Sequence, residues 1–359
     1  MNRKGGDNWQ VLLDAGLVSG NPPKPPPPAS PWYVRLMLGF AGWFAAIFLI
    51  GFFAAIFHRL FQNEALLISI GVILMALSSM AFRKLPENDF AEQFALAISF
   101  AGQFMVSFGI FELYDVKNPE TAPWWLIALI QAALVVLMPN VTHRLWSTFA
   151  AAVAVALTLH TWELGFIAYP LLLALAAWTW LNEFRWPQHG SVLRPVAYGL
   201  VLAMFASDMA ENFFRPFIGF GSPGISNAHE YAWAGQLLGG ITLLWVSWRL
   251  LREQDMVFPG KTANAILAGA LVLVLVSLEA PGIAAGVCVI LLGFSQGNHR
   301  LTGIGIAALL LYAGHYYYAL EETLLVKSQV LAATGLALLL VRWLFNRVIS
   351  PDSSFGSGP

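Results

Sequence analysis

Long apolar runs separated by short polar stretches repeat from about residue 31 to residue 348. A helix needs about 20 apolar residues, at about 1.5 Å of rise each, to cross the hydrocarbon of a bilayer. No run alternates apolar and polar positions as a half-buried strand does. The pattern therefore predicts an all-α, polytopic membrane protein with about twelve transmembrane helices, within a range of ten to twelve. The expected spans are Leu36–Phe57, Ala65–Phe82, Ala91–Tyr114, Pro123–Met138, Leu145–His160, Trp162–Leu181, Pro195–Phe214, Glu230–Leu250, Thr262–Glu279, Gly282–Phe294, Leu301–Leu320 and Ser328–Phe345.

The two ends of the chain differ in composition from this apolar region. Residues 1–30 contain a short amphipathic segment, Trp9–Val18, and then the proline-rich stretch Asn21–Pro31. Such a stretch favours an extended polyproline spacer. We therefore predict a cytoplasmic tail over 1–30, a transmembrane helical domain over 31–348, and a disordered C-terminal tail over 349–359.

The basic residues predict which side each loop occupies. With the N-terminus inside, 15 of the 19 lysines and arginines fall in cytoplasmic segments and the other 4 in outer segments. Cytoplasmic loops carry such an excess in membrane proteins. We therefore expect an even number of spans in the bacterial inner (plasma) membrane, with both termini cytoplasmic. The outer segments are correspondingly rich in acids and histidines.

Composition supports a lipid environment and excludes several function classes. The chain is 58% hydrophobic and 11% charged, against about 45–50% apolar and about 25% charged residues in soluble domains. The formal net charge of −1, with no basic stripe, excludes a nucleic-acid partner. The serine motif Gly293–Gly297 follows a membrane span rather than a strand, and Pro259–Thr262 lacks the first glycine of a phosphate-binding loop, since that position is Asp255. We expect no catalytic residue, cofactor or nucleotide.

A stripe of polar residues lies at the end of the seventh expected span. Asp208, Glu211, Asn212 and Arg215 follow an apolar run at helical spacings of three and four, so they share one face. A charge inside a bilayer costs roughly 2.5–3.5 kcal/mol on insertion scales, so it normally has a partner or contacts water. One interpretation is a proton- or cation-handling site that opens outward. The other is structural, with Glu211 paired to Arg215 and Asp208 bonded to another helix.

A histidine followed by three tyrosines, residues 315–318, lies near the end of the eleventh expected span. At about 1.5 Å per residue, His315 is about 21 Å along its helix from Leu301, and Asp208 is about 20 Å from Pro195. Histidine titrates near physiological pH, so at a common depth the two side chains could share a proton. The alternative is that this segment only anchors the outer interface.

Four further polar residues are secondary candidates: Glu112, His160, Glu163 and Glu279. His160 with Glu163, and Glu112 with Asp115, could each supply two ligands to a divalent ion. No His-Glu-x-x-His motif or cysteine pair fixes such a site, so we expect no metal. Glutamines inside the spans are expected to hydrogen-bond between helices.

Two stretches resemble a known family. One is Leu12–Gly20 with its prolines and the following Pro31-Trp-Tyr-Val-Arg35, and the other combines Gly297–Leu301, Tyr316–Leu320 and Thr323–Ser328. They resemble the bacterial membrane family known as domain of unknown function 4401, over nearly the whole chain. The family has no assigned activity, so no functional residue is carried over. Its members tend to be encoded near a small membrane protein with a Gly-Asp-Tyr motif, which implies a small membrane-protein partner.

Two functions remain open at this point. The first is a transporter-like or ion- and proton-responsive membrane protein that uses Asp208, Glu211, Asn212 and His315. The second is a non-catalytic structural or assembly subunit of a membrane complex, in which these side chains are satisfied internally. Asp208 is the strongest of the candidates, because no neighbour in the sequence neutralises it.

Overall fold

The fold is that of a computed structural model, which describes residues 13–16, 19–20, 31–56, 63–84, 89–117, 122–210, 231–253 and 260–319, together with five isolated positions between 325 and 339. This part of the chain is all-α and contains no strand. Its helices are α2 (Trp32–Ile56), α3 (Glu64–Lys84), α4 (Asp89–Leu113), α5 (Trp124–Leu137), α6 (Val141–Thr161), α7 (Gly165–Leu181), α8 (Gly190–Met209), α11 (Ala232–Glu253), α12 (Lys261–Glu279), α13 (Ile283–Ser295) and α14 (His299–Ala319), with short 3-10 turns η3 (Glu183–Arg185) and η4 (Pro187–His189).

Each of the first eleven expected spans overlaps one of these helices, which confirms the all-α prediction for the part described. Three helical stretches there are long and apolar enough to cross a membrane: Glu64–Lys84, Asp89–Leu113 and Pro187–Met209. Four more are apolar but shorter: Trp124–Leu137, Gly165–Leu181, Ala263–Leu278 and Ile283–Ser295. These helices are compatible with a membrane location. Most of the twelfth expected span and of both tails lies outside the described residues.

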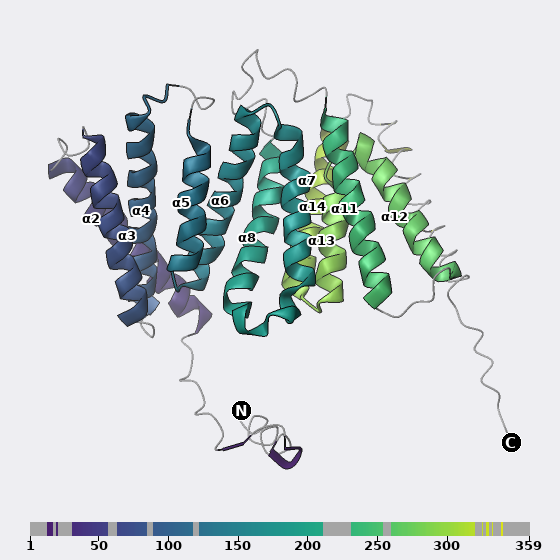
Figure 1. The fold of residues 1–359 in the computed structure, drawn as a ribbon, viewed down its shortest axis with the longest axis horizontal. Helices are drawn as coiled ribbons and strands as arrows, with labels where there is room; N and C mark the ends of the chain where they lie inside the picture. Colours follow the sequence, from purple (N-terminus) through teal and green to yellow (C-terminus); the bar gives the residue numbers. More distant parts are fainter. Residues whose placement is uncertain are drawn as a thin grey trace.

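The helices stand side by side with roughly parallel axes, forming a broad slab (Figure 1). Neighbours in sequence pack as pairs, notably α3 with α4, α5 with α6, and α13 with α14. Other contacts join distant segments, because α2 packs on α4, α6 on α8, and α11 on both α7 and α13. The middle of the slab is therefore built from helices far apart in the sequence.

Two hydrophobic cores run through the slab. One joins α3, α4, α5 and α6, and the other joins α6, α7, α8 and α11 to α14. Many side chains of the second core are small. Small residues allow helix backbones to approach closely, which is how helices associate where water does not drive them together. The fully buried alanines of this core are Ala176, Ala177, Ala203, Ala284 and Ala285.

Glycines mark the closest helix crossings. A Cβ atom added to Gly71 of α3 would lie 2.6 Å from the Gly102 carbonyl oxygen of α4, and the converse distance is also 2.6 Å. Gly235 of α11 approaches the Phe166 carbonyl oxygen of α7 in the same way, at 2.6 Å from its added Cβ. Gly235 and Gly239, four residues apart on one face of α11, therefore allow a close crossing with α7.

One end of the slab collects arginines from four helices. These arginines reach across to the ends of neighbouring helices, so they link the bundle at that end. The contacts are Arg83 Nη2 to the Leu137 carbonyl (3.4 Å), Arg144 Nη1 to the Ser191 carbonyl (3.3 Å), Arg249 Nη2 to Asn182 Oδ1 (3.3 Å), and the ion pair Arg194–Glu183. The sequence assigns all four arginines to one side, and the structure gathers them at one end, called the basic end below.

Candidate functional site

The strongest candidate from the sequence, Asp208, lies in the last turn of α8 and is only 1% exposed. Its carboxyl group lies close enough to Tyr169 of α7 and Tyr312 of α14 to act electrostatically on both hydroxyl groups, and of these two it is within hydrogen-bonding reach of Tyr312. Cys288 of α13 is fully buried in the same core as Tyr169 and Tyr312. Two pairs of helices, α7 with α8 and α13 with α14, therefore contribute side chains to this part of the core.

Two glycines make room for the two tyrosine rings. A Cβ atom added to Gly239 of α11 would lie 2.6 Å from the Tyr169 hydroxyl oxygen. A Cβ atom on Gly282, the residue before α13, would collide with the ring of Tyr312. Gly282 also has a φ of +88°, which L side chains rarely adopt. A side chain at either position would therefore displace the tyrosine ring beside it.

The surroundings of this carboxyl–tyrosine site are apolar. Val201, Met204 and Phe205 on α8 are buried, and the Phe205 ring lies 6.2 Å from that of Tyr312. A phenolic hydroxyl can donate a hydrogen bond to a carboxylate or accept one from a protonated carboxyl. The site can therefore hold a proton, and the directions of its polar contacts depend on whether the proton is bound.

The remaining primary candidates are placed differently. Glu211 and Asn212 lie outside the described residues. His315 is half-buried on α14, three residues beyond Tyr312, which corresponds to about 4.5 Å along the helix axis. The structure thus brings His315 to within one turn of the tyrosine that contacts Asp208.

The secondary candidates lie at or just beyond helix ends. Glu112 is exposed in the last turn of α4, and His160 lies in the last turn of α6. Glu163 is exposed in the α6–α7 turn with a φ of +61°, and Glu279 is the last residue of α12. Among the described residues, no group of three or more His, Cys, Asp or Glu side chains could hold a metal ion.

A second buried polar cluster was missed from the sequence. His143, near the start of α6, is 0% exposed. Its Nε2 atom lies 2.8 Å from Ser99 Oγ and 2.9 Å from Gln103 Nε2 of α4, and its Nδ1 atom lies 3.1 Å from Ser147 Oγ. The ring of Phe100 stacks on the imidazole at 5.7 Å. The expected bonding of Gln103 between helices is confirmed here.

The partners of His143 favour a neutral ring. The Gln103 amide nitrogen can only donate, so Nε2 accepts and Nδ1 carries the hydrogen, which it donates to Ser147. Asn140 caps α6 by accepting from the His143 backbone N–H at 2.8 Å and donates to Glu92 Oε1 at 2.6 Å. The cluster therefore joins α4 to α6 and is itself a structural link.

The spacing of residues in the sequence indicates part of the His143 cluster. His143 and Ser147 are four residues apart, as are Ser99 and Gln103, so each pair shares a helix face. Asn140 before an apolar helix is also a recognised capping signal. Nothing in the sequence shows that these two faces meet, because that depends on how α4 and α6 pack.

Comparisons with known proteins place the whole helical region in one family. A family model described as "Domain of unknown function (DUF4401)" matches residues 31–348. This stretch contains α2 to α14, and with them Asp208 and His143. No curated protein and no solved structure matches the chain. The resemblance seen in the sequence is confirmed, and the chain belongs to the DUF4401 family.

Proposed function

We propose that this protein is a proton-responsive, multi-pass membrane protein in which Asp208 binds and releases the proton. One observation carries the proposal: a carboxyl group that is 1% exposed interacts with two tyrosine hydroxyls from two other helices. Ionisable groups inside membrane helices are costly, and they commonly mark ion or proton pathways. The protonation state of Asp208 then controls how α8 packs against α7 and α14.

A proton suits this site better than a larger cation. Asp208 supplies one carboxyl group beside two tyrosine hydroxyls, whereas Ca²⁺ takes six to eight oxygen ligands and Mg²⁺ needs octahedral coordination. A proton can also reach a closed site through brief openings and through hydroxyl groups. The proposal therefore assigns proton sensing to Asp208, and His315, one turn beyond Tyr312, is the candidate for passing the proton onward.

The membrane setting is part of the same proposal. We place about twelve spans in a bacterial inner membrane, with the basic end and both termini facing the cytoplasm, because cytoplasmic loops carry the excess of lysine and arginine. The gathering of Arg83, Arg144, Arg194 and Arg249 at one end supports this orientation. A small membrane-protein partner, implied by the family resemblance, would bind within the bilayer.

A structural role is the second candidate, and a specific observation favours it. Asp208 is closed off in the core, and its tyrosine partners sit against glycines at close helix crossings. Hydrogen bonds between membrane helices contribute about 0.6 kcal/mol each on average, so such a site could simply fix the packing of four helices. In that case the contacts would not change with pH.

Hydrogen–deuterium exchange of the full chain in nanodiscs separates the two candidates. The measured rates are first corrected for the intrinsic pH dependence of amide hydrogen exchange. Exchange in peptides from α8 and α14 should then still rise with pH, because an ionised carboxyl in an apolar core weakens the packing. Asp208→Asn should remove this pH dependence, and Glu163→Gln, at an exposed carboxylate, should retain it. If the unaltered protein shows no pH dependence while Asp208→Asn raises exchange at every pH, the structural role is correct.

A further inference from the structure

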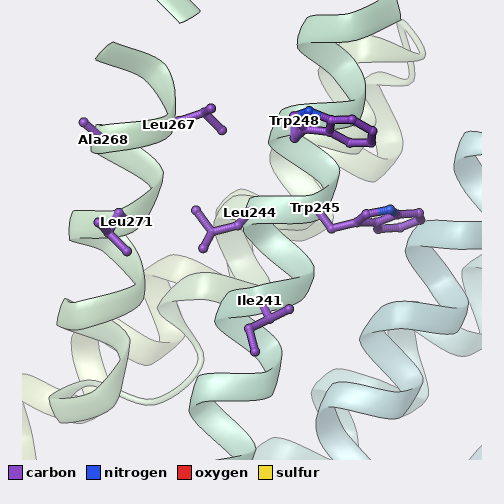
Figure 2. Close-up of a pocket in the computed structure, with 7 residues that line it drawn as sticks. All are labelled: Ile241, Leu244, Trp245, Trp248, Leu267, Ala268 and Leu271. Carbon is purple, nitrogen blue, oxygen red and sulfur yellow. The ribbon is translucent and has the colours of Figure 1, made fainter. Parts of the chain in front are cut away.

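An apolar groove opens between α11 and α12, near the basic end. It encloses about 580 Å³, and Figure 2 shows the seven side chains that line it. Leu244 of α11 and Leu267 of α12 point into the space between the two helices, while the Trp245 ring extends from the side of α11 that faces away from α12. Trp248 remains 42% exposed. The lining residues are Ile241, Leu244, Trp245, Trp248, Leu267, Ala268 and Leu271.

Two arginines stand over the tryptophans of this groove. The Arg249 guanidinium carbon lies 5.9 Å from the Trp245 ring centroid, and that of Arg252 lies 5.5 Å from the Trp248 ring centroid. Arg249 also pairs with Glu253 at 3.1 Å and bonds to Asn182. Arg252 is exposed in the last turn of α11, so its positive charge lies at the surface beside Trp248, which lines the groove.

We infer that this groove binds an anionic phospholipid. An acyl chain lies along the leucines, isoleucine and alanine, the tryptophans sit at the level of the glycerol backbone, and the phosphate group contacts Arg252 with Arg249 behind it. Basic pockets between transmembrane helices on the cytoplasmic side recognise anionic headgroups in this way. The inference rests on the proposed membrane location but not on proton binding by Asp208.

Charge complementarity selects this occupant over a second protein helix. A partner helix would need only the apolar lining and would gain nothing from an exposed arginine above a tryptophan. Guanidinium groups match phosphate oxygens in a bidentate geometry, and stacking on an aromatic ring holds them in place. The arrangement of apolar groove, tryptophan and arginine follows the order of a phospholipid from tail to headgroup.

Native mass spectrometry of the full chain tests the inference. The protein is equilibrated with equimolar phosphatidylglycerol and phosphatidylcholine, and the retained adducts are counted. We expect phosphatidylglycerol to be enriched several-fold. Arg252→Gln should remove most of this enrichment. Ala268→Phe, which adds a bulky side chain at an exposed lining position without changing charge, should reduce it as well.

A matched control separates a specific site from general surface charge. Arg300 is exposed at the start of α14 and does not line the groove, so Arg300→Gln should retain the enrichment. Equal losses in Arg252→Gln and Arg300→Gln, or unchanged enrichment in both Arg252→Gln and Ala268→Phe, would overturn the lipid site. Absence of any lipid adduct after equilibration would likewise overturn the lipid site.

Discussion

At the scale of single residues, the account depends on one acid and the groups around it. The sequence identifies Asp208 because it is an acid that follows an apolar run with no adjacent neutralising charge. It does not identify Tyr169 or Tyr312, since their contacts with Asp208 arise only when α7, α8 and α14 pack together. Aromatic residues are common throughout this chain, and only the fold distinguishes these two.

Gly282 should be intolerant of any side chain. Gly282→Ala would collide with the Tyr312 ring and would force an alanine into a left-handed conformation, which costs about 1–3 kcal/mol before the collision is counted. We expect a clear drop in the thermal unfolding temperature in detergent. Gly303→Ala is the matched control, because Gly303 has open space around it on α14 and alanine is the better helix former. Equal stability of the two variants would contradict the described packing of Tyr312.

At the scale of helices, the apolar pattern predicts where most elements lie. The break between α12 and α13 falls at Pro281 and Gly282, as the sequence indicates. The pattern places the start of α6 four residues too late, at Leu145 rather than Val141, because a polar first turn is not visible as an apolar run. Asn140 supplies the missing signal by capping that turn. The sequence does not predict which helix faces meet, as the His143 cluster shows.

His143 should be worth more to stability than any one of its partners. His143→Ala removes the group shared by Ser99, Gln103 and Ser147 and leaves buried polar atoms without a partner, at about 1–3 kcal/mol for each atom left unsatisfied. Ser147→Ala leaves only the Nδ1 hydrogen of His143 without a partner and should cost about 1–3 kcal/mol, the lower part of the loss expected for His143→Ala. Chemical unfolding in detergent measures both. A smaller loss in His143→Ala than in Ser147→Ala would contradict the described cluster.

At the scale of the whole molecule, charge distribution and topology support each other. Composition alone indicates a lipid environment, and the arginine contacts at the basic end join α3 to α5, α6 to α8, α8 to η3, and α11 to the end of α7. The order of the helices across the slab was not predictable from the sequence. This order depends on small residues at helix crossings. Gly71 and Gly102, for example, meet at one crossing although they lie on different helices.

Loop positions at the two ends should label from opposite sides of the membrane. Cys288 is the sole cysteine and is buried, so Cys288→Ala provides a background for single-cysteine labelling. In spheroplasts, an impermeant maleimide should react with cysteine introduced at Glu163 and spare cysteine introduced at His189, on the α7–α8 connection. Labelling of both positions from the outside would contradict the proposed orientation.

Infrared difference spectroscopy of the full chain in nanodiscs tests the central claim most directly, because it observes the Asp208 carboxyl itself. The account predicts a carbonyl band of a protonated carboxylic acid in an apolar environment that disappears as pH rises and is missing in Asp208→Asn. Tyr312→Phe should shift this band, since Tyr312 interacts with the carboxyl. Identical pH difference spectra for the unaltered protein and Asp208→Asn would contradict proton binding at Asp208.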